Sequence, residues 1–190
     1  LPESCKTINH YAFSGCDLLT DVNFDYVTVI GTSAFSNCES LTCDDVGGAN
    51  LKGVYNIGAS AFYNTRLSSV VLTNLGRCGT AAFANCSKLV SVELGKKTRI
   101  SERMFENTAL KTVTVYSDII ADKAFYGCDK LTTVNLESDM TYLGASAFDG
   151  CRSLASITFK GGCEQIGSNA YETSATFQIV LTAGHFPQAD

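Results

Sequence analysis

An Ala-Phe pair, or a close variant of it, recurs along this chain at nearly constant spacing, and this repetition constrains the fold more than any other feature. Successive aromatic positions are separated by 22, 27, 21, 22, 20, 23 and 23 residues. These positions are Phe13, Phe35, Phe62, Phe83, Phe105, Phe125, Phe148 and Tyr171. A period of about 20 to 30 residues is typical of a solenoid, in which each repeat buries its apolar side chains against the neighbouring repeats.

Each repeat divides into three segments. The first reads Leu-x-x-Val-x-Leu, as in Leu131/Val134/Leu136, and its alternation predicts a short strand with one buried face. The second is an Ile-Gly pair or its equivalent, such as Ile57-Gly58. The third carries the Ala-Phe pair and is long enough only for a single turn of helix or 3₁₀ structure. Two residues after the aromatic position, seven of eight repeats have Gly or Asn, which predicts a left-handed residue there.

The predicted fold class is therefore an α/β solenoid. We expect an array of about eight repeats of 20–27 residues, with a parallel β-sheet on the concave face and short helical turns on the convex face. Residues 1–190 form one domain, either complete or part of a longer array. Residues 42–54 lengthen one repeat and form an insertion loop, which is either a tolerated surface insertion or a contributor to a binding site.

Eight of the nine cysteines follow the repeat rather than a disulfide framework, and only Cys43 lies off the pattern. Five of them lie three residues after the aromatic position, where other repeats have Thr or Ser: Cys16, Cys38, Cys86, Cys128 and Cys151. Such a slot requires a small, slightly polar side chain, so we expect mostly reduced thiols in the core. A disulfide that involves Cys5 or Cys43 stays open and would indicate an oxidising compartment.

The sequence has no constellation that indicates catalysis. His10 and His185 have no motif partner, and Asn85-Cys86-Ser87 matches a glycosylation sequon whose Asn also fills the turn slot. We therefore expect no enzyme, no metal and no cofactor. An enzyme that uses the insertion would need a metal or substrate near Asp44 and Asp45. The net charge of −5 argues against nucleic acid as a partner, and no apolar run is long enough to insert into a membrane.

The combined pattern resembles the BspA-like, or Treponema pallidum type, leucine-rich repeat. The best matches to Ile-Gly-x-x-Ala-Phe-x-x-Cys are residues 30–38 and, with Leu in the Ile position, residues 143–151. Proteins of this family occur on bacterial surfaces and in mucosal or parasitic protists, and some attach to fibronectin, fibrinogen or other cells. The resemblance implies adhesion or protein recognition, whereas the repeat itself specifies only the scaffold.

The outward positions of the strands are the candidate binding surface. The candidate residues are Asp21, Asn23, Asp25, Ser69, Val71, Ser91, Glu93, Thr112, Thr114, Tyr116, Thr133, Asn135 and Glu137. Tyr116 is a candidate aromatic anchor, and the acidic positions would suit a basic patch on a partner. The alternative is that Ser and Thr occur there only because they suit exposed strands.

Two functional hypotheses remain. The first is a non-enzymatic protein-recognition or adhesion module, surface-exposed or secreted, whose concave face binds a protein ligand such as a host matrix or cell-surface protein. The alternative is an intracellular, cytoplasmic adaptor or scaffold, which the many expected free thiols favour.

Overall fold

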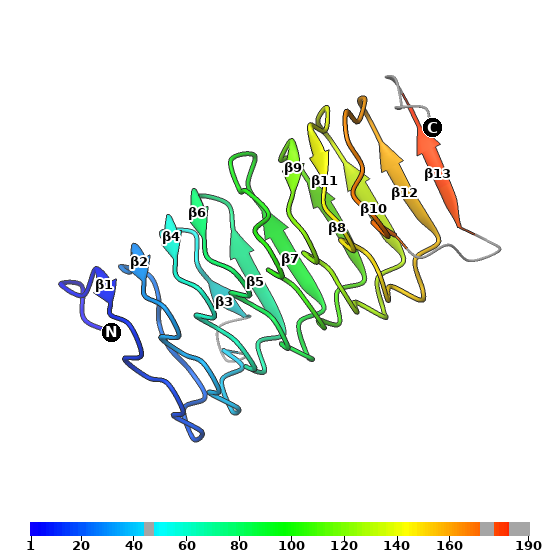
Figure 1. Ribbon diagram of the computed structural model, residues 1–190. Coiled ribbons are helices and arrows are strands. Elements are labelled where there is room, and N and C mark those ends of the chain that lie inside the picture. Colours follow the sequence, from blue (N-terminus) through cyan, green and yellow to red (C-terminus); the bar gives the residue numbers. More distant parts are fainter. Residues whose placement is uncertain (44–47, 172–176, 183–190) are drawn as a thin grey trace.

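The computed structural model describes residues 1–43, 48–171 and 177–182. Figure 1 shows the turns of the chain stacked in one row, with the first and the last described residues at opposite ends of that row. Within the described ranges the regular structure consists of short strands, and every strand pair is parallel. Parallel pairing follows because each turn of a solenoid runs in the same direction as the previous one.

The strands line two sides of the stack, which we call the wide sheet and the narrow sheet, and on each side the hydrogen-bonded ladders fall into two separate groups. The wide sheet contains β3 (Ala49–Asn50), β5 (Ser69–Leu72), β7 (Ser91–Leu94), β8 (Thr112–Val115), β10 (Thr133–Leu136), β12 (Ser156–Phe159) and β13 (Gln178–Leu181). The narrow sheet contains β1 (Thr7–Ile8), β2 (Val29–Ile30), β4 (Asn56–Ile57), β6 (Arg77–Cys78), β9 (Ile119–Ile120) and β11 (Tyr142–Leu143). The wide sheet corresponds to the predicted Leu-x-x-Val-x-Leu strands, and the narrow sheet corresponds to the Ile-Gly segments.

Two columns of buried side chains run through the space that these segments enclose. In the phenylalanine column, the rings from Phe13 to Phe148 stack with centroid distances of 5.2 to 5.7 Å between successive turns. The aliphatic column lies three residues before the Ile position and contains Val27, Val54, Leu75, Met140 and Cys163, all buried. Stacked rings contribute beyond the apolar area that they bury, so the phenylalanine column both fills the core and aligns the turns.

The predicted helical turns are wrong, because the described residues contain no helix. Successive backbone amides around Phe35 alternate between hydrogen bonds to the next turn of the solenoid and hydrogen bonds within their own turn. The amides of Phe35 and Asn37 donate to the next turn, to the carbonyls of Ala61 and Tyr63, whereas the Ser36 amide closes a local turn onto Ser33. A helix needs successive amides to bond within the same segment, so the bonds between turns exclude it. The fold is therefore a parallel β-solenoid rather than an α/β array.

Left-handed residues reinforce this geometry. The predicted positive φ two residues after the aromatic position is confirmed at Gly15, Asn37, Asn64, Asn85, Asn107, Gly127 and Gly150, while Thr173 lies outside the described residues. A second left-handed residue, which the sequence did not predict, lies four positions earlier. In successive repeats this residue is Tyr11, Ser33, Ser60, Ala81, Arg103, Lys123, Ser146 and Asn169. Two left-handed residues in one short segment prevent any continuous right-handed helix.

The expected insertion at residues 42–54 is partly integrated into the solenoid. Residues 44–47 lie outside the described residues. After them, Ala49–Asn50 forms β3, which pairs with β5 in the wide sheet. Leu51 and Val54 are buried in the core. The second half of this segment is therefore part of a turn of the stack.

Candidate recognition surface

Strand register aligns the outward side chains of the wide sheet in columns. Ser69 is opposite Ser91, and Val71 is opposite Glu93, on the ladder that joins β5 to β7. On β8 and β10, Thr112 is opposite Thr133 and Thr114 is opposite Asn135. The residues between them point inward: Val70, Leu72, Val113, Val115, Val134 and Leu136 are buried. The register thus aligns these eight candidate residues on the outward side of their strands, while their role in binding stays a prediction.

The columns are interrupted in the middle of the molecule. Within the described residues, the ladders of the wide sheet join β3, β5 and β7 in one group, and β8, β10, β12 and β13 in another. Between β7 and β8, the backbone bond from the Lys111 N–H to the Val90 carbonyl is long, at 3.4 Å. Val92 of β7 is half-buried, although Val70 and Val113 at the same position are fully buried. The candidate surface thus consists of two blocks.

Tyr116 and Glu137 extend the second block beyond the ends of β8 and β10. The half-buried Tyr116 has its carbonyl hydrogen-bonded by the Ser138 hydroxyl at 2.7 Å. The Glu137 carboxylate accepts a hydrogen bond from the Lys160 ammonium at 2.8 Å. This hydrogen bond and the attraction of the carboxylate raise the pKa of Lys160. Because Glu137 is already paired, it is less free to attract a basic partner than the sequence suggested.

The three candidate residues of the first turn lie apart from the ladders. None of Asp21, Asn23 and Asp25 belongs to a strand. The Asn23 side-chain oxygen accepts from the Asp25 N–H at 2.8 Å, which forms a local turn. A hollow of about 260 Å³ lies between this turn and the second one, lined by Val22, Asn23, Phe24, Asp25 and Asn50. These residues therefore lie at the margin of the candidate surface and do not continue its columns.

The other motifs from the sequence have structural roles or lie outside the described residues. His10 accepts a hydrogen bond from the Thr32 N–H at Nδ1, at 2.9 Å. His185, Asp44 and Asp45 are not described. Within residues 1–43, 48–171 and 177–182, no group of three or more His, Cys, Asp or Glu side chains is arranged to hold a metal ion. A search of the same ranges also finds no helix with the length and apolarity to span a bilayer.

The Asn of the sequon is part of the turn stack. The Asn85 side-chain amide donates to the Tyr63 hydroxyl at 2.7 Å, and its oxygen accepts from the Asn107 amide at 2.9 Å. Cys86, the middle residue of the sequon, is completely buried. A glycan on the Asn85 amide nitrogen would crowd its contact with the Tyr63 hydroxyl, so the structure favours the turn role of Asn85.

The structure contains no disulfide among the nine cysteines, and six of them are buried. Four of the five in the repeat slot make the same contact, in which Sγ donates to the carbonyl of the Phe in the preceding turn, at 3.0 Å for Cys38, Cys86 and Cys128 and at 3.2 Å for Cys151. Burial raises the pKa of Cys86 to about 11, so its nucleophilic thiolate is scarce near neutral pH. These contacts explain why the slot accepts only small side chains with a polar hydrogen.

The sequence interpretation missed a basic hollow at the narrow sheet. Arg77, Lys97 and Arg99 line it, together with residues of three successive turns. The signal was visible in the run Lys96-Lys97-Thr98-Arg99, since Lys97 occupies the slot that holds Val27, Val54 or Leu75 in the preceding turns.

Comparison with known proteins agrees with this architecture. Residues 6–120 and 118–185 match the BspA type leucine rich repeat region, in six copies. A comparison with curated proteins finds no match. A leucine-rich repeat protein from Bacteroides ovatus ATCC 8483 is 20% identical, with a TM-score of 0.68 over 98% of this chain and 60% of that one. The Treponema pallidum leucine-rich repeat protein is also 20% identical, with a TM-score of 0.53 over 97% of this chain and 75% of its own.

The match to the solved structures concerns the fold, and this chain spans only 60% of the length of the Bacteroides ovatus protein. The family match is more specific, because its six repeat copies extend over almost the whole sequence. The stacked Phe rings and the parallel ladders provide the physical basis for that match. The chain therefore belongs to the BspA-type leucine-rich repeat family.

Proposed function

We propose that this chain is a non-enzymatic recognition module that is exposed on the cell surface or secreted and binds a protein ligand through the wide sheet. Its family consists of repeat proteins that are typical of protein interaction. The observation that supports the proposal most is the register of β8 and β10, which presents Thr112, Thr114, Thr133 and Asn135 as a regular polar grid. A rigid grid loses little conformational entropy on binding, and this favours a protein partner.

A binding assay with variants of this grid tests the proposal. The ligands are immobilised fibronectin and fibrinogen, and the variant carries Thr114→Arg and Asn135→Arg, which adds two large cations to adjacent strands. The matched control carries Gln165→Arg and Ser168→Arg, two exposed positions outside the wide sheet. We expect the first variant to bind at least tenfold more weakly than the wild type and the control to bind normally. Equal binding of all three proteins would exclude the wide sheet as the binding face.

The location of the protein requires a separate experiment. Protease treatment of intact source cells should release peptides of this chain while a cytosolic marker stays intact. If the chain is protected until lysis, and is then cleaved, the surface proposal is wrong. The alternative is a cytoplasmic adaptor, which the lack of any disulfide among the nine cysteines favours, because reducing compartments keep thiols reduced.

A further inference from the structure

The aliphatic column is broken in two successive turns in the middle of the stack. Val27, Val54 and Leu75 fill its slot in the earlier turns, and Met140 and Cys163 fill it in the later ones. Between them the slot holds the exposed Lys97 and then the small polar Ser117. Two apolar side chains are therefore missing from adjacent layers.

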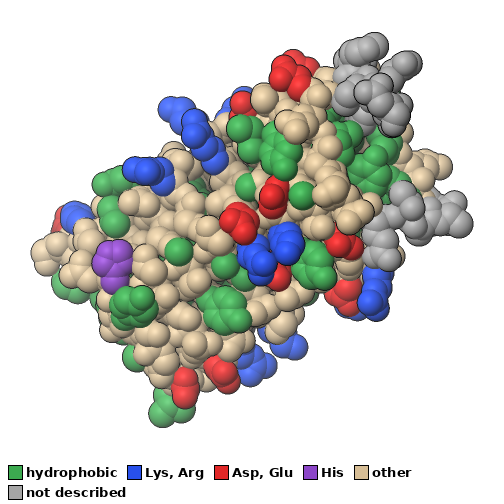
Figure 2. Space-filling view, viewed as in Figure 1, with side chains coloured by type: hydrophobic (Ala, Val, Ile, Leu, Met, Phe, Trp, Pro, Cys, Tyr) green, Lys and Arg blue, Asp and Glu red, His purple; other side chains and the backbone are tan. Residues whose placement is uncertain are grey.

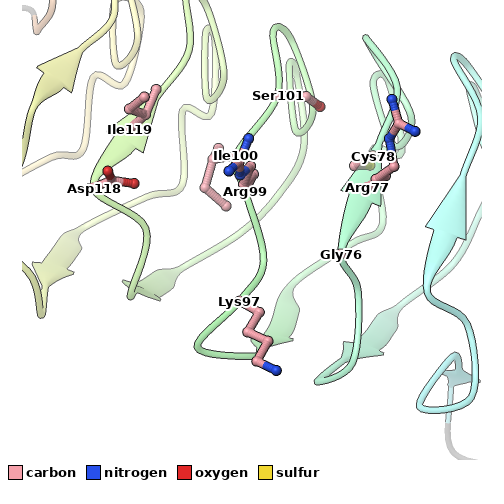
Figure 3. Close-up of a pocket in the computed structure, with 9 residues that line it drawn as sticks. All are labelled: Gly76, Arg77, Cys78, Lys97, Arg99, Ile100, Ser101, Asp118 and Ile119. Atoms are coloured by element: carbon pink, nitrogen blue, oxygen red, sulfur yellow. The ribbon is translucent and has the colours of Figure 1, made fainter.

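A hollow lies at the position of the missing side chains. Its volume is about 850 Å³, and it is lined by Gly76, Arg77, Cys78, Lys97, Arg99, Ile100, Ser101, Asp118 and Ile119. Figure 3 shows that these residues come from three neighbouring turns, with β6 on one side and Asp118 and Ile119 on the other. A smaller hollow of about 280 Å³ shares Lys97, Arg99 and Asp118 with it and extends to Lys96 and Tyr116. We call the two together the basic notch.

Both sheets are interrupted next to the basic notch. In the described part of the chain, the narrow-sheet ladder that begins at β1 ends at β6, and Ile100 bridges to Ile120 of the following turn but not to Cys78. In the same place the Ser101 hydroxyl donates to the Gly79 carbonyl at 3.0 Å. The wide sheet is interrupted one step later, between β7 and β8. The segment at residues 95–100 thus departs from the regular stacking on both sides.

The basic notch concentrates positive charge on an acidic protein. Arg77, Lys96, Lys97 and Arg99 line it, and all four are exposed and form no ion pair within the described residues. Asp118 is the single carboxylate in its lining. Figure 2 shows basic side chains gathered along the upper left edge of the molecule, whose net charge is −5. An anionic ligand is therefore attracted here and repelled by much of the remaining surface.

Hydrogen bonds within the turn and to the preceding turn of the solenoid fix the backbone that carries Lys96 and Lys97. The buried Thr98 donates its hydroxyl proton to the Leu72 carbonyl at 3.0 Å and accepts from the Gly95 N–H at 3.2 Å. Its own N–H bonds to the Gly95 carbonyl at 3.1 Å. A Cβ on Gly95 would collide with the Thr73 carbonyl oxygen, so only Gly fits the close approach of the two chains. Lys96 and Lys97 are consequently presented on a fixed backbone.

We propose that the basic notch binds a sulfated polysaccharide. The cations are spread over successive turns, which suits a linear ligand with repeated negative groups. Arginine forms bidentate hydrogen bonds with planar or tetrahedral oxyanions, and Arg77 and Arg99 are both available for such contacts. The apolar or aromatic side chains that reach the surface of the lining are Ile119 and the half-buried Cys78 and Tyr116, whereas the core of a protein interface is usually richer in such anchors. A highly charged glycan needs no such anchor, and this favours it over an acidic protein segment.

The proposal is tested by titrating the chain with a heparin-derived octasaccharide in low salt. The test variant is Lys96→Ser with Lys97→Ser. The matched control is Lys88→Ser with Lys111→Ser, which removes the same charge from exposed lysines that do not line the basic notch. We expect the test variant to bind about tenfold more weakly and the control less than twofold more weakly, with both melting temperatures unchanged. Binding of the wild type should weaken roughly tenfold when sodium chloride is raised from about 50 to 300 mM.

Two further probes identify the ligand class. Hyaluronan of equal length carries carboxylates but no sulfates, and poly-glutamate represents an acidic protein segment. We expect both to bind at least tenfold more weakly than the octasaccharide. Absence of octasaccharide binding in low salt would overturn the proposal, and so would equal losses in the two double variants. Equal binding of hyaluronan would exclude a requirement for sulfate, and tighter binding of poly-glutamate would replace the glycan with an acidic protein partner.

Discussion

The phenylalanine column and the aliphatic column occupy the same stack but tolerate change differently. The rings from Phe13 to Phe148 follow one another without a gap, with interplanar angles of 19° or less. The aliphatic column loses its apolar member in the turns of Lys97 and Ser117. The phenylalanine column thus continues through the stack without interruption, whereas the aliphatic column can lack its apolar side chain in individual turns. Where the aliphatic column is interrupted, the surface has a hollow and a cluster of positively charged side chains.

The largest effect should follow from breaking the phenylalanine column. Phe125 is fully buried and stacks on Phe105 and Phe148 at 5.5 and 5.2 Å. Phe125→Ala should lower the free energy of unfolding by about 3–5 kcal/mol, because it leaves a cavity between two rings. Urea denaturation measures this change. A loss below about 1 kcal/mol would mean that the rings are not the principal core.

A smaller effect is expected in the aliphatic column beside the basic notch. Leu75 is buried, but the next turn has Lys97 in place of an apolar neighbour. We expect Leu75→Ala to cost roughly 2–4 kcal/mol, less than Phe125→Ala under the same conditions, because fewer contacts are lost. A larger loss for Leu75 than for Phe125 would reverse the ranking of the two columns.

A third change tests the turn that interrupts the aliphatic column. Gly95→Ala places a methyl group against the Thr73 carbonyl oxygen and should destabilise the fold by about 1–3 kcal/mol. The control is Gly76→Ala, since a Cβ there meets only the Tyr55 carbonyl oxygen at 3.6 Å, an ordinary contact. Thermal melts of both variants provide the comparison. Equal stability of the two would show that the turn at residues 95–98 is not held closely against the preceding one.

The smallest effect concerns the unexpected left-handed residues. Lys123 has a φ of 55°, which is unfavourable for a residue with a Cβ. Lys123→Gly should stabilise the fold by roughly 0.5 kcal/mol, because relief of this strain exceeds the extra entropy of Gly in the unfolded chain. Lys130→Gly, at an exposed position without positive φ, should instead be destabilising. If both substitutions changed the free energy of unfolding in the same direction, the proposed backbone strain at Lys123 would be contradicted.

Much of the scaffold was predictable because every turn repeats the same chemistry. The period located the buried Val134 and Leu136, the outward Thr133 and Asn135, and the left-handed Gly127. The helical turns were wrong because a single repeat does not reveal that alternate amides, such as that of Phe35, bond to the next turn. A left-handed Lys123 also carries no compositional signal, since Lys rarely adopts that conformation.

The candidate surface was predictable only as far as it is periodic. Strand alternation placed Ser69, Ser91, Thr112 and Thr133 on one face, as the ladders have them. The break between β7 and β8 and the basic notch depend on how residues 95–100 deviate from their neighbours in space. A deviation in one repeat can be recognised in the sequence, but its consequence for packing follows only from the stacked structure.

Hydrogen–deuterium exchange of the free chain tests the central claim most directly, that the stack is continuous at the Phe turns and open at the basic notch. The Phe83 and Phe105 amides donate to the Met104 and Ala124 carbonyls and should be strongly protected. Within the described residues no ladder or bridge joins Cys78 to Ile100, so the Cys78 and Ser101 amides should exchange much faster than the Gly79 and Gly144 amides, which donate to the preceding turns. Equal protection of these four amides would contradict the account, because the narrow sheet would then run unbroken past the basic notch.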